Sequence, residues 1–163
     1  MITSPGATPP DSQENTVPKY FTIWEAEDLL EQLSEPLRQA ITQRAELSAL
    51  ESRIQEEARR VFLSGGAVVN QAEAVRLRLR RDALTRSLQE TVQQVQQHGC
   101  LIKDLDIGLL DFPTLYQGRE VYLCWKLGEE SIQYWHEVED GFRGRQPVDA
   151  DFLAHHSGSA RAS

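Results

Sequence analysis

The sequence lacks the features that mark several familiar classes of protein. Positive charge is not in surplus, because 17 Lys and Arg stand against 25 Asp and Glu and the net charge is -8, which disfavours binding to nucleic acid. No apolar run approaches the roughly 20 residues that cross a bilayer. The amino terminus has no basic stretch followed by an apolar one, so no secretory signal is expected. We therefore expect a cytoplasmic protein without a membrane segment.

Recognisable catalytic and metal-binding motifs are also missing. The two cysteines, Cys100 and Cys124, have a spacing that fits neither a zinc ribbon nor a CxxC redox pair. The sequence contains no phosphate-binding glycine loop and no Gly-x-Ser-x-Gly nucleophile elbow. The segment 104–108 begins like a calcium loop but lacks the later ligands, so a polar turn is expected there. The 163 residues indicate one domain whose activity no motif reveals.

Heptad spacing predicts an antiparallel helical hairpin over residues 22–98. The first helix opens with a capping box of Thr22 and Glu25. Its apolar residues then recur three and four positions apart, with Arg44 and Glu51 filling the two gaps. Glycines at 65 and 66 end this helix, and a second stripe of the same spacing runs over residues 74–95. The short connection makes the two helices neighbours.

The two helices differ in length and in charge. Residues 23–63 would span about 60 Å as a helix, and residues 71–97 about 40 Å. Pro36 favours a kink, so we expect Ile23–Glu35 to leave the hairpin and cover one face of the carboxyl-terminal half. Residues 21–62 carry a net charge of -4 and residues 63–99 a net charge of +2. Opposite charges favour pairing of the helices, although each exposed ion pair contributes only about 0–1 kcal/mol.

From Cys100 onward the apolar period changes to that of strands. Short strands are expected at 100–103 and at 109–113, where Pro113 ends the second one. A clear strand follows at 121–127. Gly128-Glu129 fits a two-residue turn, which would place His136 on the apolar face of the returning strand and Trp135 on the other, exposed face. A three-residue loop would exchange these two faces.

These elements define an α+β fold. We expect a long antiparallel two-helix hairpin, similar to a coiled coil, with a small carboxyl-terminal antiparallel β-sheet. Residues 20–149 would form the single domain, with the hairpin at 22–98 and the sheet at 100–140. Residues 1–19 and 150–163 lack apolar periodicity and are expected to be a disordered leader and a disordered tail.

Several runs of the sequence resemble one family. They include Gly99-Cys100 with Lys103-Asp104, Gly108 to Pro113, Gly118 to Trp125, Trp135 to Glu137 and Gly141 to Arg145. Together they resemble the uncharacterised bacterial family called domain of unknown function 2203, over about residues 20–148. The resemblance implies a small cytosolic protein with a helical hairpin and a compact carboxyl-terminal part. It implies no established activity, cofactor or catalytic residue.

The carboxyl-terminal half holds the residues that are suited to chemistry. Asp111, Cys124, His136, Glu137 and Asp140 are metal-ligand or acid–base types. Neighbours in a strand point to opposite faces, so Asp111 is a better partner for His136 than Glu137 is. One hypothesis is therefore a protein that binds a metal or a small ligand, with hydrolysis as a candidate activity and a divalent metal as a candidate cofactor. The alternative for His136 is a hydrogen-bonded core histidine.

The leading hypothesis from the sequence is a protein interaction module. A hairpin about 40 Å long exposes much of its sides, so self-association or binding of a protein partner through the hairpin is expected. A weaker alternative is a nucleic-acid-associated regulator. Its candidate residues form a basic patch on the second helix: Arg76, Arg78, Arg80 and Arg81. Arg143 and Arg145 are further candidates for binding an anion. Trp135 is the candidate exposed aromatic residue.

Overall fold

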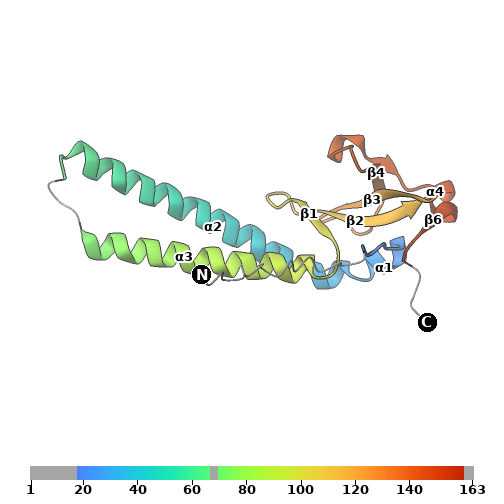
Figure 1. The fold of residues 1–163 in the computed structure, drawn as a ribbon, viewed down its shortest axis with the longest axis horizontal. Coiled ribbons are helices and arrows are strands. Elements are labelled where there is room, and N and C mark those ends of the chain that lie inside the picture. Colours follow the sequence, from blue (N-terminus) through green and yellow to red (C-terminus); the bar gives the residue numbers. More distant parts are fainter. Residues whose placement is uncertain (1–17, 67–69, 160–163) are drawn as a thin grey trace, which may run out of the picture.

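A long helical hairpin projects from a small antiparallel sheet (Figure 1), which confirms the α+β fold expected from the sequence. The structure is a computed structural model that describes residues 18–66 and 70–159. Its helices are α1 (Ile23–Glu27), α2 (Leu30–Leu63), α3 (Gln71–Gln96), the 3-10 turn η1 (Phe142–Gly144) and α4 (Ala150–His155). Its strands are β1 (Leu101–Asp104), β2 (Leu109–Tyr116), β3 (Arg119–Lys126), β4 (Tyr134–Glu137), β5 (Gln146–Pro147) and β6 (His156–Ser157).

The first helical segment leaves the hairpin earlier than the sequence indicated. The capping box of Thr22 and Glu25 is present and opens α1. The helix breaks at Asp28–Leu29, where the Leu29 N–H donates to the carbonyl of Ala26 at 3.1 Å. By contrast, α2 runs through Pro36 without ending. The break, and not the proline, lets α1 pack on the sheet, while the first turns of α2 complete the same core.

The contact between α2 and α3 keeps most of the predicted stripe, but at its two charged positions the residue before is the one that is buried. Arg44 and Glu51 are exposed, whereas Gln43 and Leu50 are buried. The amide of Gln43 donates to the Ser87 hydroxyl across the hairpin at 2.8 Å. In Figure 1 the two helices move apart toward their connection. An apolar groove of about 250 Å³ lies between them there, lined by Ile54, Glu57, Ala58, Val61, Ala74, Leu77 and Arg78.

The sheet has the strand order β1-β2-β3-β4-β5, and β6 pairs with β2 beyond the end of β1. The prediction that Pro113 ends its strand is wrong, because β2 continues to Tyr116. The backbone nitrogen and the carbonyl oxygen of Pro113 both point away from β3, into the gap between β1 and β6. Its carbonyl there accepts a hydrogen bond from the Phe21 N–H at 2.7 Å. The missing N–H of Pro113 therefore removes no bond from the β2–β3 ladder.

The β3–β4 pairing differs from the predicted two-residue hairpin. Cys124 pairs with Tyr134 and Tyr122 with His136, and residues 127–133 form the connection. A shift of one position exchanges the faces of a strand. His136 therefore lies on the face of Cys124, opposite the main core, while Trp135 packs into that core. Both predicted faces were wrong for the same reason.

The carboxyl-terminal segment is part of the fold, so the predicted disordered tail is wrong for residues 150–159. Phe152 of α4 is fully buried and stacks on Trp135, with ring centroids 5.1 Å apart. His156 is buried, and its Nε2 accepts a hydrogen bond from the Ile23 N–H at 3.1 Å. The predicted sheet at 100–140 therefore extends to Ser157. Most of the predicted leader and residues 160–163 of the predicted tail lie outside the described residues.

The main core lies between one face of the sheet and α1 with the start of α2. It contains Phe21, Ile23, Ala26, Leu30, Leu33, Leu37, Leu110, Phe112, Val121, Leu123, Trp125, Ile132, Trp135 and Phe152. None of the helices within residues 18–66 and 70–159 has both the length and the apolar character needed to span a membrane.

Candidate functional site

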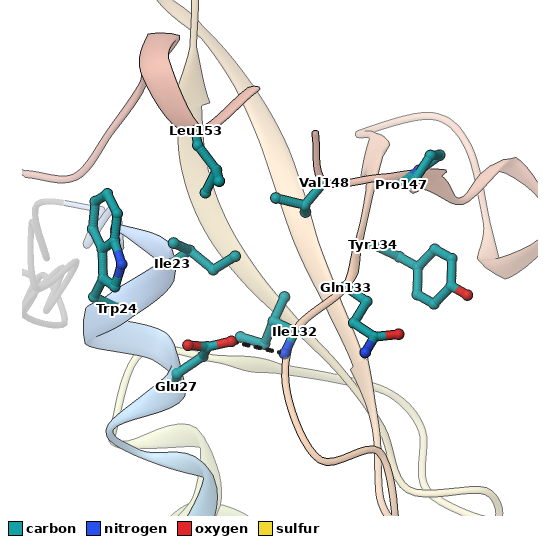
Figure 2. A pocket seen from close by; sticks show the side chains of 9 residues that line it. All are labelled: Ile23, Trp24, Glu27, Ile132, Gln133, Tyr134, Pro147, Val148 and Leu153. Atoms are coloured by element: carbon teal, nitrogen blue, oxygen red, sulfur yellow. Dashed lines mark hydrogen bonds between the residues drawn. The ribbon is translucent and has the colours of Figure 1, made fainter. Parts of the chain in front are cut away.

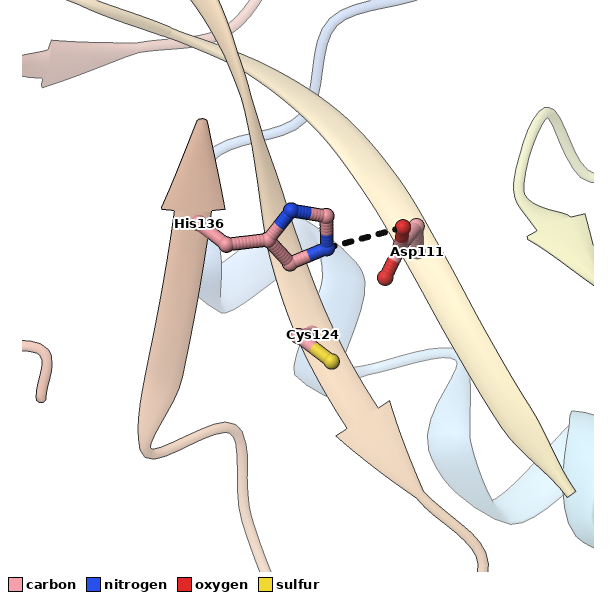
Figure 3. A group of neighbouring side chains, drawn as sticks. All are labelled: Asp111, Cys124 and His136. Atoms are coloured by element: carbon pink, nitrogen blue, oxygen red, sulfur yellow. Dashed lines mark hydrogen bonds and ion pairs between the residues drawn. The ribbon is translucent and has the colours of Figure 1, made fainter. Parts of the chain in front are cut away.

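The sheet face opposite the main core carries a row of three polar side chains. Asp111 of β2 lies directly opposite Cys124 of β3, and His136 of β4 is the diagonal neighbour of Cys124. Side chains alternate between the two faces of a strand, so this register puts all three on one side. Figure 3 shows the His136 ring reaching across β3 to Asp111, with the Cys124 sulfur beside them.

The three side chains are close together and nearly out of solvent. His136 Nε2 lies 2.9 Å from Asp111 Oδ2. One ligand atom from each of Asp111, Cys124 and His136 lies within 4.8 Å of the others. Asp111 and Cys124 are fully buried, and His136 is 3% exposed. Burial of polar groups is costly unless they are paired or bind a metal, so this cluster needs a compensating interaction.

Hydrogen bonding defines the charge state of the cluster. His136 Nδ1 donates to the backbone carbonyl of Glu137 at 2.7 Å, and Nε2 faces the carboxylate of Asp111. A backbone carbonyl can only accept, so Nδ1 carries a proton, and Nε2 is the ring nitrogen that faces Asp111. The hydrogen bonds to Asp111, then to Cys124, raise the pKa of His136 to about 10, against the opposing effect of burial.

One atom of the cluster stays unsatisfied. Asp111 Oδ1 is buried and has no hydrogen-bond partner anywhere in residues 18–66 and 70–159. A carboxylate oxygen that is buried without a partner is uncommon and calls for a bound ion or another explanation. The ion pair with His136 therefore accounts for one oxygen of Asp111 and leaves the other free to bind a ligand.

A pocket of about 370 Å³ opens onto this cluster. Lys103 lies on one wall, and its ammonium group sits 4.9 Å from the centre of the Tyr122 ring. Asp140 lies on another wall, where its N–H donates to the Glu137 carbonyl at 3.0 Å. The lining residues are Lys103, Asp104, Leu109, Asp111, His136, Glu139, Asp140, Gly141 and Phe142.

The ligand set is that of a borderline-soft transition metal. Zinc binds thiolate, imidazole and carboxylate groups, and three protein ligands with one open position are typical of reactive zinc sites. The hydrogen bond from His136 Nδ1 to a backbone carbonyl is the outer contact that usually orients a metal-binding imidazole. Asp111, Cys124 and His136 are thus the described residues that are suited to hold a metal.

The other predicted ligands fall outside this cluster. Glu137 points to the opposite side of β4 and forms an ion pair with Arg119 at 2.6 Å. Asp140 lines the pocket but is not one of the three clustered ligands. Lys103 and Tyr122 were missed by the sequence reasoning. The sequence feature that could have found them is the alternation of side chains along β1 and β3, which places Lys103 and Tyr122 on the same sheet face as Asp111.

The predicted basic patch does not form one surface. Residues four apart share a helix face, so Arg76 and Arg80 lie on one side of α3, and Arg78 and Arg81 point elsewhere. Arg81 binds the neighbouring Asp82 at 3.2 Å. Arg145 also has a partner, because its guanidinium donates to both carboxylate oxygens of Glu129, at 3.0 and 2.9 Å, whereas Arg143 is exposed.

The prediction of Trp135 as the exposed aromatic residue is wrong. Trp135 is 7% exposed, whereas Trp24 of α1 is 58% exposed. Trp24 borders a second, shallow pocket of about 500 Å³ between α1, the segment before β4, and α4. Figure 2 shows its mainly apolar lining and the Glu27 carboxylate, which accepts a hydrogen bond from the Ile132 N–H at 3.1 Å.

Comparison with known proteins identifies a family but no activity. Residues 19–148 match the family described as "Uncharacterized conserved protein (DUF2203)". This match covers most of the chain, so the protein belongs to the DUF2203 family, as the resemblance in its sequence indicated. Neither the curated proteins nor the solved structures give a significant match.

Proposed function

We propose that the protein binds a divalent transition metal, zinc by preference, through Asp111, Cys124 and His136. The observation that carries the proposal is the convergence of three different ligand types on adjacent strands, with Asp111 Oδ1 buried and unpaired. Zinc with a thiolate and a carboxylate makes a neutral site, which suits a buried position. The cytoplasm, where thiols stay reduced, is the compartment that we propose for a site depending on Cys124.

The alternative for these residues is a purely structural ion pair. A proton on each ring nitrogen of His136 accounts for its contacts with Asp111 and Glu137 without any metal. That arrangement leaves Asp111 Oδ1 buried without a partner. A metal ion uses all three side chains at once, which favours the metal site.

The test is zinc content and affinity in the intact chain. Protein purified without chelator should contain about one zinc per chain by elemental analysis. Cys124→Ser and His136→Gln should each lower zinc affinity by tenfold or more. Cys100→Ser is the matched control, because Cys100 is also a buried free cysteine but lies in the main core, and it should keep wild-type affinity. Equal zinc affinity in all four proteins would refute the proposal.

A second candidate function is protein interaction through the outer half of the hairpin. Its support is the exposure of large apolar side chains near the connection of α2 and α3: Phe62 is 83%, Leu63 69%, Leu79 62% and Val75 53% exposed. Contiguous exposed apolar surface is typical of protein-binding sites. Sedimentation at micromolar concentration tests self-association. A concentration-dependent dimer that Leu79→Glu abolishes supports it, and a monomer at every concentration refutes it.

A further inference from the structure

The pocket beside the cluster contains groups that a metal-dependent hydrolase needs. The cluster supplies three protein ligands, so a bound zinc ion keeps its fourth position for water or substrate. Asp111 and His136 are the two members of the cluster that line the pocket, so water or substrate would reach a bound metal from this side. A water molecule on zinc is acidified to near neutral pH and becomes a nucleophile.

Asp140 lines the same pocket as Asp111 and His136 and carries a carboxylate, the type of group that can serve as the base for such a water molecule. It follows β4 in a turn closed by the Asp140 N–H and the Glu137 carbonyl. Gly144 packs against it so closely that a Cβ on Gly144 would come within 2.6 Å of the Asp140 Cβ. The Gly144 N–H donates to the Gly141 carbonyl at 2.8 Å. These contacts hold the Asp140 carboxylate on the pocket wall, although its side chain has no buried partner of its own.

The charge and size of the pocket limit the class of substrate. Among the lining residues that the structure describes, Lys103 is the one lysine or arginine, against the carboxylates of Asp104, Glu139 and Asp140 that lie outside the cluster. This balance opposes polyanions such as polyphosphates, and it allows one developing negative charge to be stabilised by Lys103. A volume of about 370 Å³ suits a small molecule. A small carboxylic ester or amide fits both limits.

We propose that the protein hydrolyses a small carboxylic ester or amide, with Asp140 as general base; this rests on the proposed metal site. Zinc-bound water gives a proton to Asp140, and the resulting hydroxide adds to the carbonyl carbon. The oxyanion is stabilised by the metal and Lys103. The bond from this carbon to the alcohol or amine then breaks, and Asp140 returns the proton to the leaving atom. One water molecule is consumed, and an acid and an alcohol or amine are released.

Hydrolysis of p-nitrophenyl acetate by the zinc-loaded full chain tests this proposal. We expect saturable hydrolysis that exceeds the rates of the metal-free protein and of free zinc. Asp140→Asn should lower kcat at least tenfold and leave zinc content and KM nearly unchanged. Glu130→Gln is the matched control, because Glu130 is an exposed carboxylate that does not line this pocket, and its rate should stay within twofold of wild type.

The outcomes separate the two proposals. A zinc-loaded protein that is no faster than its metal-free form overturns the hydrolytic activity and leaves the metal site standing. Equal rates for Asp140→Asn and wild type overturn the role of Asp140. A second measurement does not depend on whether this ester fits the pocket: acetohydroxamate is added to the cobalt-substituted protein, and the cobalt absorption spectrum is recorded. If saturating acetohydroxamate leaves the spectrum unchanged, the metal has no position open to the pocket, and this also overturns the proposal. Failure to bind zinc overturns both.

Discussion

Replacement of Asp111 by Asn tests the buried pair that organises the cluster. Asp111 is fully buried, His136 is 3% exposed, and their nearest side-chain atoms are 2.9 Å apart. Removing the charge of one partner from a buried pair typically costs about 3–5 kcal/mol, because the other charge is left uncompensated. Asn keeps the shape and one acceptor of Asp, so we expect a loss near the lower limit, about 3 kcal/mol. This is a large fraction of the roughly 5–15 kcal/mol that stabilises a typical domain.

The pH dependence of this loss has a defined sign. Asp111 raises the pKa of His136 to about 10 in the folded protein, against 6.5 for an unperturbed histidine. The resulting stabilisation is fully present below pH 6.5 and is lost as the pH rises through 10. The difference in unfolding free energy between wild type and Asp111→Asn should therefore be largest near pH 6 and should shrink between pH 6.5 and 10.

The assay is urea unfolding with a chelator present, so that only the metal-free protein is measured. Glu139→Gln provides the control, since a substitution away from a buried network usually changes stability by about 0.5 kcal/mol or less. NMR titration of His136 gives an independent readout, and its pKa should fall in Asp111→Asn. A loss below about 1 kcal/mol at pH 6, with an unchanged His136 titration, would refute the reasoning.

Three further predictions concern the rest of the fold. Phe152→Ala should destabilise the protein by about 3–5 kcal/mol in urea unfolding, because Phe152 is fully buried; a near-zero loss would mean that α4 does not pack on the core. Gly108→Ala should cost at least about 1 kcal/mol, since φ is +66° and the added Cβ would lie 2.7 Å from the Leu127 Cβ; thermal denaturation measures it, and unchanged melting contradicts it. Iodide should quench mainly the fluorescence of Trp24, and Trp24→Phe should remove most of the quenching; strong residual quenching would place Trp125 or Trp135 at the surface.

The helical hairpin could be predicted because its signals are local. The capping residues Thr22 and Asn70 act on amides three residues away, and both caps are present in the structure. The exact contact stripe could not be predicted in the same way. The stripes through Arg44 and through Gln43 both fit a spacing of three and four, and only the crossing of the helices decides between them.

The β3–β4 connection depends on contacts from distant parts of the chain. The Glu129 carboxylate binds the Lys126 N–H and the Arg145 guanidinium, and Glu27 of α1 binds the Ile132 N–H. These partners hold residues 127–133 open where the local sequence favours a tight turn. The faces of His136 and Trp135 could therefore not be derived from the strand alone.

The candidate site could be predicted in part. Asp111 was chosen as the partner of His136 because Glu137 must point to the other face of its strand, and the structure places Asp111 beside His136. The contribution of Cys124 depends on the β3–β4 register, and so does the approach of all three side chains. The order of the carboxyl-terminal segment depends on the stacking of Phe152 with Trp135. These two residues are distant in the sequence, so no local pattern predicts their contact.

X-ray absorption at the zinc edge of the zinc-loaded protein tests the central claim most directly, because it identifies the atoms bound to the metal. The account predicts one sulfur ligand at about 2.3 Å and nitrogen or oxygen ligands at about 2.0–2.1 Å, with the sulfur lost in Cys124→Ser and kept in Cys100→Ser. A zinc environment of nitrogen and oxygen alone in the wild-type protein, or a chain that binds no zinc, would contradict it.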